Sequence, residues 1–303
     1  MGRKKSLFFG SAVALVTPFS DGGVDYVSFG EMIEFQISNG TDAIVILGTT
    51  GEASTIYENE RCEIISFAKQ KIASRVPLIV GTGSNATSVA VRYTKTAEAL
   101  GADGCLVVSP YYNKATPKGL YMHYCEIAKS VKIPIIMYNV PTRTGVNIPL
   151  SVYGDLASLE NIVAIKEASG SIGYTEEIIE KYGDYYDVYT GCDELTLPTL
   201  ALGGKGVISV ACNIVPSYMH QLCFEYAQGN VEKSRELQLY INPLIKELFC
   251  EVNPIPVKTA LYKMGMCKNE FRLPMCKSTR ERQISAILKQ YNLITNGYVT
   301  ENN

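Results

Sequence analysis

The sequence contains no tryptophan and only two histidines in 303 residues. His123 and His220 stand too far apart along the chain for the close spacing of metal-binding motifs. The nine cysteines include no Cys-x-x-Cys pair, so the usual zinc and redox motifs are absent. An odd number of scattered thiols is typical of free cysteines in a reducing cytoplasm. We therefore expect a cytoplasmic protein without a metal site.

Strong net charge and long apolar runs are also lacking. The net charge is −2 and the isoelectric point is near 5.9, which indicates neither a nucleic-acid nor a membrane partner. No apolar stretch approaches the roughly 18 residues of a membrane-spanning helix. Residues 7–19 follow a basic start, as in a secretory signal, but no small-residue cleavage pattern closes them. We interpret them as a buried first strand.

What the sequence has is a regular alternation of short apolar runs and helical patterns. The runs are residues 12–17, 43–47, 77–81, 104–108, 134–138, 162–166, 186–190 and 206–210. Apolar strands that alternate with amphipathic helices predict a parallel sheet covered by helices. Eight such units predict a closed (β/α)8 barrel, the TIM barrel. An open doubly wound sheet is the alternative, although no Gly-x-Gly-x-x-Gly follows the first run.

Helix signals lie between the apolar runs. The helical pattern of residues 29–37 is followed by Asn-Gly, and the pattern of residues 86–104 has Thr87 as a candidate N-cap. Beyond about residue 230, helical patterns continue without intervening apolar runs. We predict a catalytic barrel over residues 1–230 and a C-terminal helical extension over residues 231–303.

A lysine stands at the end of the sixth predicted strand. Active sites of such barrels lie at the carboxyl ends of the strands, and Lys166 is placed there. Burial disfavours the charged amine, and a neutral amine can form a Schiff base with a carbonyl compound. The alternative is a lysine that pairs with a carboxylate at the barrel rim or extends to water. Glu167 is adjacent in sequence but points to the opposite face of the strand, which favours a reactive amine.

Other polar residues end neighbouring strands. Tyr138 ends the fifth strand, about 4.8 Å from the sixth, and is a candidate for proton transfer. Thr49 and Thr50 would face Lys166 across the barrel mouth, and a hydroxyl network with Thr50 would orient Tyr138. Arg143 follows on a loop, where its guanidinium suits a carboxylate. Ordinary packing of Tyr138 and a surface role for Arg143 are the alternatives.

Six motifs occur in an order that resembles the dihydrodipicolinate synthase family. They are GTTGE (48–52), PYYN (110–113), YNVPTRTG (138–145), AIKEASG (164–170), TGCDE (190–194) and GVISV (206–210). This family belongs to a superfamily of pyruvate-dependent Schiff-base lyases and aldolases with (β/α)8 barrels. The similarity extends over nearly the whole chain.

The resemblance implies a catalytic set. Lys166 would form an imine with pyruvate, and Tyr138 would be the general acid and base. Thr50 would be the bridging hydroxyl of a Tyr–Thr–Tyr proton relay. Tyr112, the second tyrosine of the relay, would reach across from a neighbouring subunit of a homodimer or homotetramer.

It also implies the substrates. Arg143 would hold the carboxylate of L-aspartate 4-semialdehyde, and Thr49, Thr50, Gly191 and Ile208 would line the pyruvate end. The product would be 4-hydroxy-tetrahydrodipicolinate, on the route to diaminopimelate and lysine, with no metal or dissociable cofactor implied. A sugar-acid aldolase similar to N-acetylneuraminate lyase is an alternative, although that class tends to carry a neutral residue at the place of Arg143. A non-catalytic barrel that binds small acids is an alternative of another class.

In many members of the family, lysine binds at the dimer interface as a feedback inhibitor, and the resemblance implies which residues would form that site. Asn85 and Tyr111 match the lysine-sensitive members. Four positions depart from them, where those members tend to have serine, two histidines and a glutamate; these are Ala53, Glu58, Arg61 and Val89. Loss of the glutamate removes a partner for the amine of lysine, and Arg61 adds a like charge. We expect weak or absent inhibition.

Overall fold

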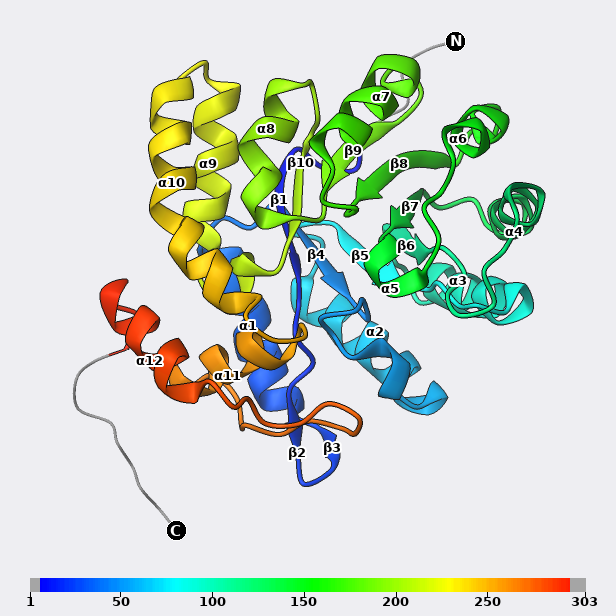
Figure 1. Cartoon of the computed structure of the whole chain (residues 1–303). Helices are drawn as coiled ribbons and strands as arrows, with labels where there is room; N and C mark the ends of the chain where they lie inside the picture. Colours follow the sequence, from blue (N-terminus) through cyan, green and yellow to red (C-terminus); the bar gives the residue numbers. More distant parts are fainter. Residues whose placement is uncertain (1–5, 295–303) are drawn as a thin grey trace.

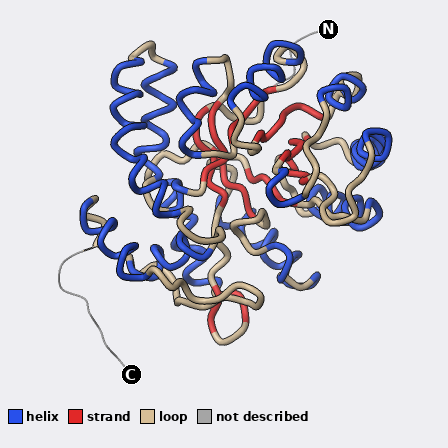
Figure 2. The backbone as a smooth tube through the Cα atoms, in the orientation of Figure 1, coloured by secondary structure: helices blue, strands red, loops and turns tan. Residues whose placement is uncertain are grey.

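A computed structural model describes residues 6–294 and shows a closed barrel of eight parallel strands surrounded by helices (Figures 1 and 2). Around the barrel the strand order is β1-β10-β9-β8-β7-β6-β5-β4. The strands are β1 Gly10–Ala14, β4 Ala43–Ile46, β5 Leu78–Gly81, β6 Gly104–Val108, β7 Ile135–Asn139, β8 Ile162–Glu167, β9 Asp187–Thr190 and β10 Gly206–Ser209. Because β1 pairs with both β4 and β10, the sheet closes, which confirms the predicted barrel and excludes the open sheet.

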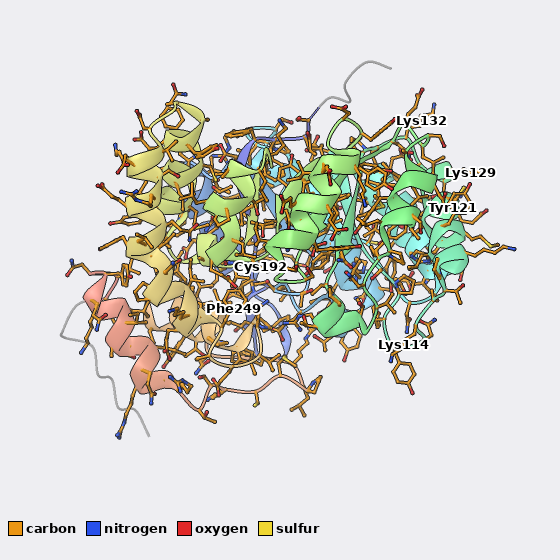
Figure 3. The ribbon with its side chains drawn as sticks, turned by 45° about the horizontal axis from the view of Figure 1, so that its top comes forward. Lys114, Tyr121, Lys129, Lys132, Cys192 and Phe249 are labelled. Carbon is orange, nitrogen blue, oxygen red and sulfur yellow. The ribbon has the colours of Figure 1, made fainter. Side chains whose placement is uncertain are left out.

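Helices follow the strands and cover the outside of the barrel (Figure 1). They are α1 Tyr26–Ser38, α2 Glu58–Ile72, α3 Thr87–Ala99, α4 Pro117–Lys129, α5 Pro141–Thr144, α6 Leu150–Leu156, α7 Ile172–Tyr182, α8 Thr196–Ala201 and α9 Pro216–Ala227. Three single turns of 3-10 helix are Ala53–Thr55, Asp193–Leu195 and Ala211–Asn213. Apolar side chains fill the layer between helices and strands, whereas Lys129 and Lys132 project outward (Figure 3).

The predicted helix ends are partly correct. Helix α1 ends at Ser38, before Asn39 and the left-handed Gly40, as the Asn-Gly pair predicts. The predicted threonine cap of α3 is wrong, because Thr87 is its first helical residue and Ala86 is the N-cap. The Thr87 hydroxyl lies instead 3.0 Å from Nδ1 of the buried His123.

Three helices follow the barrel: α10 Val231–Leu248, α11 Ile255–Lys263 and α12 Glu281–Gln290. No strand occurs from 231 to 294. The segment between α11 and α12 lies beside a small hairpin, β2 Phe19–Ser20 and β3 Gly23–Val24 (Figure 1). That these helices form a unit distinct from the barrel remains a prediction, and residues 295–303 of that unit lie outside the described part.

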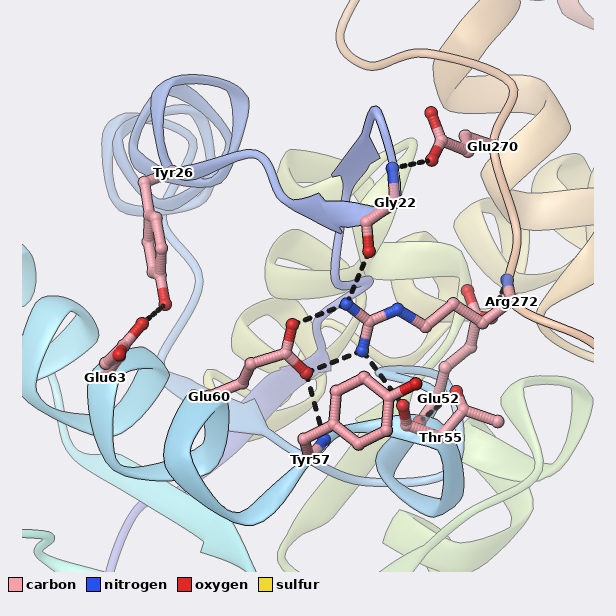
Figure 4. Close-up of polar contacts among 9 residues, drawn as sticks. All are labelled: Gly22, Tyr26, Glu52, Thr55, Tyr57, Glu60, Glu63, Glu270 and Arg272. Carbon is pink, nitrogen blue, oxygen red and sulfur yellow. Dashed lines mark hydrogen bonds and ion pairs between the residues drawn. The ribbon is translucent and has the colours of Figure 1, made fainter.

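Arg272 anchors this C-terminal segment to the barrel. Its guanidinium donates to both carboxylate oxygens of Glu60 and to the carbonyl oxygens of Thr55 and Gly22, as Figure 4 shows. Glu270 accepts hydrogen bonds from the backbone N–H groups of the hairpin turn. The segment therefore spans from the hairpin to the loop that follows β4.

The barrel interior has its own apolar core, separate from the layer under the helices. Small and large side chains alternate in it, including Ala12, Val45, Ile79, Tyr189 and Ile208, all fully buried. This core fills the barrel below the carboxyl ends of the strands, and a cavity lies above it at the mouth. Within residues 6–294, no helix is long and apolar enough to cross a membrane, and no three potential metal ligands cluster.

Candidate active site

Lys166 and Tyr138 lie side by side at the barrel mouth. They are register partners in adjacent strands, and Nζ of Lys166 lies 4.5 Å from the centre of the Tyr138 ring. Lys166 is 5% exposed and Tyr138 is 7% exposed, so both are shielded from bulk water. The structure thus brings together the two residues that the strand pattern predicts to meet.

Burial sets the state of the amine. It lowers the pKa of Lys166 to about 8, although the nearby Asp193 carboxylate opposes the shift. At pH 7 about a tenth of such an amine is neutral, far more than for an ordinary lysine. In the described part of the chain no carboxylate lies within ion-pair distance of Lys166. Glu167 points to the opposite face, where it accepts hydrogen bonds from Asn139 and Ser169. These contacts favour the reactive amine over the paired one.

Gly191 leaves room for the lysine side chain. A Cβ atom on this glycine would lie 2.6 Å from Cε of Lys166 and 2.7 Å from Cβ of Ala168, both closer than real contacts allow. Its backbone N–H donates to the carbonyl of Glu167 at 2.7 Å, which holds the two strand ends together. Ile208 lies on β10 in the apolar barrel interior.

The hydrogen bond of Tyr138 involves a different threonine from the predicted one, and the predicted role of Thr50 in proton transfer stays a prediction. The Tyr138 side chain is hydrogen-bonded to Thr49, whereas Oγ1 of Thr50 accepts a hydrogen bond from Nδ2 of Asn253 at 3.0 Å. The predicted contact between Thr50 and Tyr138 is therefore replaced by one with Thr49. The reason is that β4 ends at Ile46 and Leu47 has a left-handed backbone with φ of 54°, so strand alternation does not reach the threonines.

Tyr138 keeps its proton at neutral pH. Burial raises the pKa of Tyr138 to about 12, although the positive charge of Arg143 and the Thr49 hydrogen bond oppose this. A protonated hydroxyl next to the lysine can donate to an oxygen that develops on a bound carbonyl.

Tyr112 is not part of the site in its own chain. It is 90% exposed, and its backbone is left-handed with φ of 71°. The side chain extends into solvent rather than towards Tyr138.

The mouth is a cavity of about 440 Å³ with a cation at its edge. It is lined, among others, by Thr49, Tyr138, Arg143 and Asn253. Arg143 is exposed on the short helix α5, and its Nη2 donates to the backbone oxygen of Asn253 at 3.0 Å. Asn253 is not among the residues predicted from the sequence, because it lies 110 residues from Arg143, between α10 and α11. The sequence around it, Asn-Pro-Ile-Pro, indicates a turn, but it does not indicate that this turn lies at the barrel mouth.

A buried amine with a lowered pKa, a protonated tyrosine beside it and an arginine at the mouth of a (β/α)8 barrel define the class of Schiff-base-forming lyases and aldolases. The model of the "Dihydrodipicolinate synthetase family" matches residues 7–291. Because this match covers almost the whole chain, the protein belongs to that family and is a Schiff-base-forming lyase.

Individual relatives agree with this placement. A 4-hydroxy-tetrahydrodipicolinate synthase of Acetivibrio thermocellus is 50% identical over 293 residues, covering 96% of this chain and all of the relative. The crystal structure of the Aquifex aeolicus dihydrodipicolinate synthase is 47% identical, with a TM-score of 0.93 over 96% of this chain and all of that one. The chloride-inhibited synthase from Acinetobacter baumannii, solved with pyruvate, is 42% identical, with a TM-score of 0.92 over 94% of this chain and 99% of that one.

Proposed function

We propose that this chain acts as a 4-hydroxy-tetrahydrodipicolinate synthase, which condenses pyruvate with L-aspartate 4-semialdehyde. The observation that carries the proposal is the buried amine of Lys166 beside Tyr138, with its pKa lowered to about 8, in a member of this family. Relatives at about half sequence identity bear the name of this activity.

The first half of the reaction activates pyruvate. The neutral amine of Lys166 attacks the ketone carbon, and the resulting carbinolamine loses water to give an imine. Loss of a methyl proton then gives an enamine. We assign these proton transfers to Tyr138, with Thr49 as its hydrogen-bond partner.

The second half builds the ring. The enamine carbon attacks the aldehyde carbon of the second substrate, and the aldehyde oxygen takes a proton to become the hydroxyl group. The substrate amine then attacks the imine carbon and displaces Lys166, so that one water is released for each product molecule. The guanidinium of Arg143 would bind the carboxylate of the second substrate at the mouth.

The rival enzyme is a pyruvate-dependent sugar-acid aldolase. A cation at the mouth suits a short electrophile with a carboxylate, whereas a polyhydroxylated sugar needs neutral hydrogen-bond partners. The test offers pyruvate with either L-aspartate 4-semialdehyde or N-acetylmannosamine. The proposal predicts that pyruvate is consumed only with the semialdehyde; consumption only with the sugar would overturn it.

We propose that the active form is a homodimer, or a tetramer of such dimers, in which Tyr112 of each subunit enters the site of its neighbour. The exposure of Tyr112 supports this, because an almost fully solvated aromatic side chain leaves most of its apolar surface unburied. We also propose a cytoplasmic location, which the nine free thiols support.

We further propose weak or absent inhibition by lysine. The guanidinium of Arg61 donates to the carbonyl oxygens of Gly81 and Ala53 at 3.0 and 3.1 Å and lies 4.2 Å from the centre of the Tyr93 ring. A cation held in this way repels the ammonium group of lysine. Activity measured against increasing lysine tests this, and half-inhibition well below millimolar lysine would contradict it.

A further inference from the structure

Asn253 connects two parts of the active site. It lies between α10 and α11, and it is 8% exposed. Its backbone oxygen accepts a hydrogen bond from Arg143 at 3.0 Å, and its Nδ2 donates to Oγ1 of Thr50 at 3.0 Å. A single residue between two C-terminal helices is therefore hydrogen-bonded both to Arg143 at the barrel mouth and to Thr50 in the loop after β4.

One polar atom of Asn253 has no partner. Its Oδ1 is buried, and no donor within residues 6–294 forms a hydrogen bond with it. A buried carbonyl oxygen without a donor costs free energy, so such atoms in folded proteins call for an explanation. Asn253 lines the same cavity as Tyr138 and Arg143. A donor on a molecule bound in this cavity would complete its hydrogen bonds.

The position of Arg143 indicates which donor fits. An α-amino acid carries its carboxylate and its ammonium group on the same carbon atom, so the protein groups that bind them must be neighbours. The guanidinium of Arg143 and the side chain of Asn253 meet this requirement, because one is hydrogen-bonded to the backbone of the other. A neutral amide oxygen accepts from an ammonium group without adding a charge that would compete for Arg143.

We propose that Oδ1 of Asn253 accepts a hydrogen bond from the α-ammonium group of the amino-aldehyde substrate. Arg143 and Asn253 then form a paired site that selects an α-amino acid over the same molecule without its amino group. The inference rests on the proposed function and assigns a specificity-determining residue to it.

The test compares two ligands in the variant Asn253→Leu, which keeps a side chain of similar size. The ligands are L-aspartate 4-semialdehyde and 4-oxobutanoate, the same aldehyde without the amino group, used as a competitive inhibitor. We expect the KM for the amino-aldehyde to rise about 10-fold to 100-fold. The inhibition constant of 4-oxobutanoate should stay within about twofold, because this molecule has no ammonium group to lose the contact.

Two more variants separate loss of the proposed contact from a general effect on the fold. Asn253→Gln keeps a neutral amide acceptor at this place, so the preference for the amino-aldehyde should be retained even if the leucine variant does not fold. Asn269 serves as the matched control, because its Oδ1 is also buried without a partner within residues 6–294 and it does not line the cavity. Asn269→Leu should change neither constant.

Equal weakening of both ligands in Asn253→Leu would overturn the proposal, since it would show a purely structural role. An unchanged KM for the amino-aldehyde in Asn253→Leu, or loss of the preference in Asn253→Gln, would overturn it as well. Failure of the proposed function itself would be visible separately, as wild-type protein that does not condense pyruvate with the amino-aldehyde.

Discussion

At the scale of single residues, the proposed mechanism depends on an amine that the barrel keeps away from water. Lys166 is 5% exposed, and desolvation is the main cause of its lowered pKa. Desolvation also raises the pKa of the neighbouring Tyr138, which keeps the tyrosine protonated. Burial therefore prepares a nucleophile and a proton donor at the same place.

This gives an expected pH dependence. The charged amine cannot attack a ketone, and its pKa is lowered from 10.5 to about 8, so the neutral fraction grows as the pH rises through 8. The rate of imine formation with pyruvate, measured by quenching with cyanoborohydride between about pH 6 and pH 9.5, should rise with a midpoint near 8. A rate that still rises steeply at the upper end of this range, without a midpoint, would show that the lysine is not desolvated.

The glycine beside the lysine provides a second prediction. In Gly191→Ala the new methyl group would overlap Cε of Lys166 and Cβ of Ala168, so the lysine must leave its place. We expect imine formation to slow by at least about 100-fold with the fold preserved, because a displaced nucleophile loses its alignment. Mass spectrometry of the reduced adduct and circular dichroism would measure the two effects. Gly173→Ala serves as the control for adduct formation, because its added Cβ would meet only the Ser171 hydroxyl oxygen, at 4.0 Å. Near wild-type adduct formation in Gly191→Ala would contradict the packing argument.

At the scale of elements, the C-terminal helices hold the loop that carries the threonines. Nζ of Lys258 on α11 lies 2.6 Å from Oε1 of Glu52, and both side chains are at most 1% exposed. The other oxygen of Glu52 accepts from the backbone N–H of Arg272. A buried ion pair thus fixes the end of the GTTGE loop.

Removal of one partner should be costly. Lys258→Met leaves the Glu52 carboxylate buried without its cation, so we expect the free energy of unfolding to fall by about 3–5 kcal/mol. Urea unfolding measures this. The double variant Glu52→Gln with Lys258→Met should recover part of the loss, because no uncompensated charge remains. A loss below about 1 kcal/mol in the single variant would show that the pair is not structural.

The sequence predicts the elements better than it predicts the loops. All eight strands were expected, because buried parallel strands are continuous apolar runs, and this placed Lys166 beside Tyr138. The hydrogen-bond partner of Tyr138 is Thr49 and not the expected Thr50, because both threonines lie after the end of β4, where side chains no longer alternate between faces. Asn253 could not be found, because no local pattern connects it to strand ends more than 100 residues away. Contacts of this kind depend on how the C-terminal helices pack.

At the scale of the whole molecule, one residue expected in the active site, Tyr112, lies outside the site of its own chain. Tyr112 lies on the outside with 90% of its surface exposed, whereas Tyr138 is buried in the barrel mouth. If a second copy supplies Tyr112, each site of a symmetric dimer depends on both chains.

Hybrid dimers test this dependence. Lys166→Ala and Tyr112→Phe should each have little activity alone. Co-expressed in equal amounts, they should recover about a quarter of the wild-type activity, because half of the dimers are hybrids with one complete site. The condensation rate of the unfractionated mixture measures this, and tagged, purified hybrids should reach about half of the wild-type rate. No recovery in such hybrids would place Tyr112 in the site of its own chain, and full activity of Tyr112→Phe alone would place it outside catalysis.

The most direct test of the account is the intact mass after incubation with pyruvate and borohydride, with wild type and Lys166→Ala compared. We predict one reduced pyruvate adduct per wild-type chain, mapped by peptide digestion to Lys166 and absent from the variant. The other buried lysine, Lys258, should stay unmodified because it is paired with Glu52. A folded wild-type protein that gains no adduct, or a variant that still gains one, would contradict the Schiff-base mechanism.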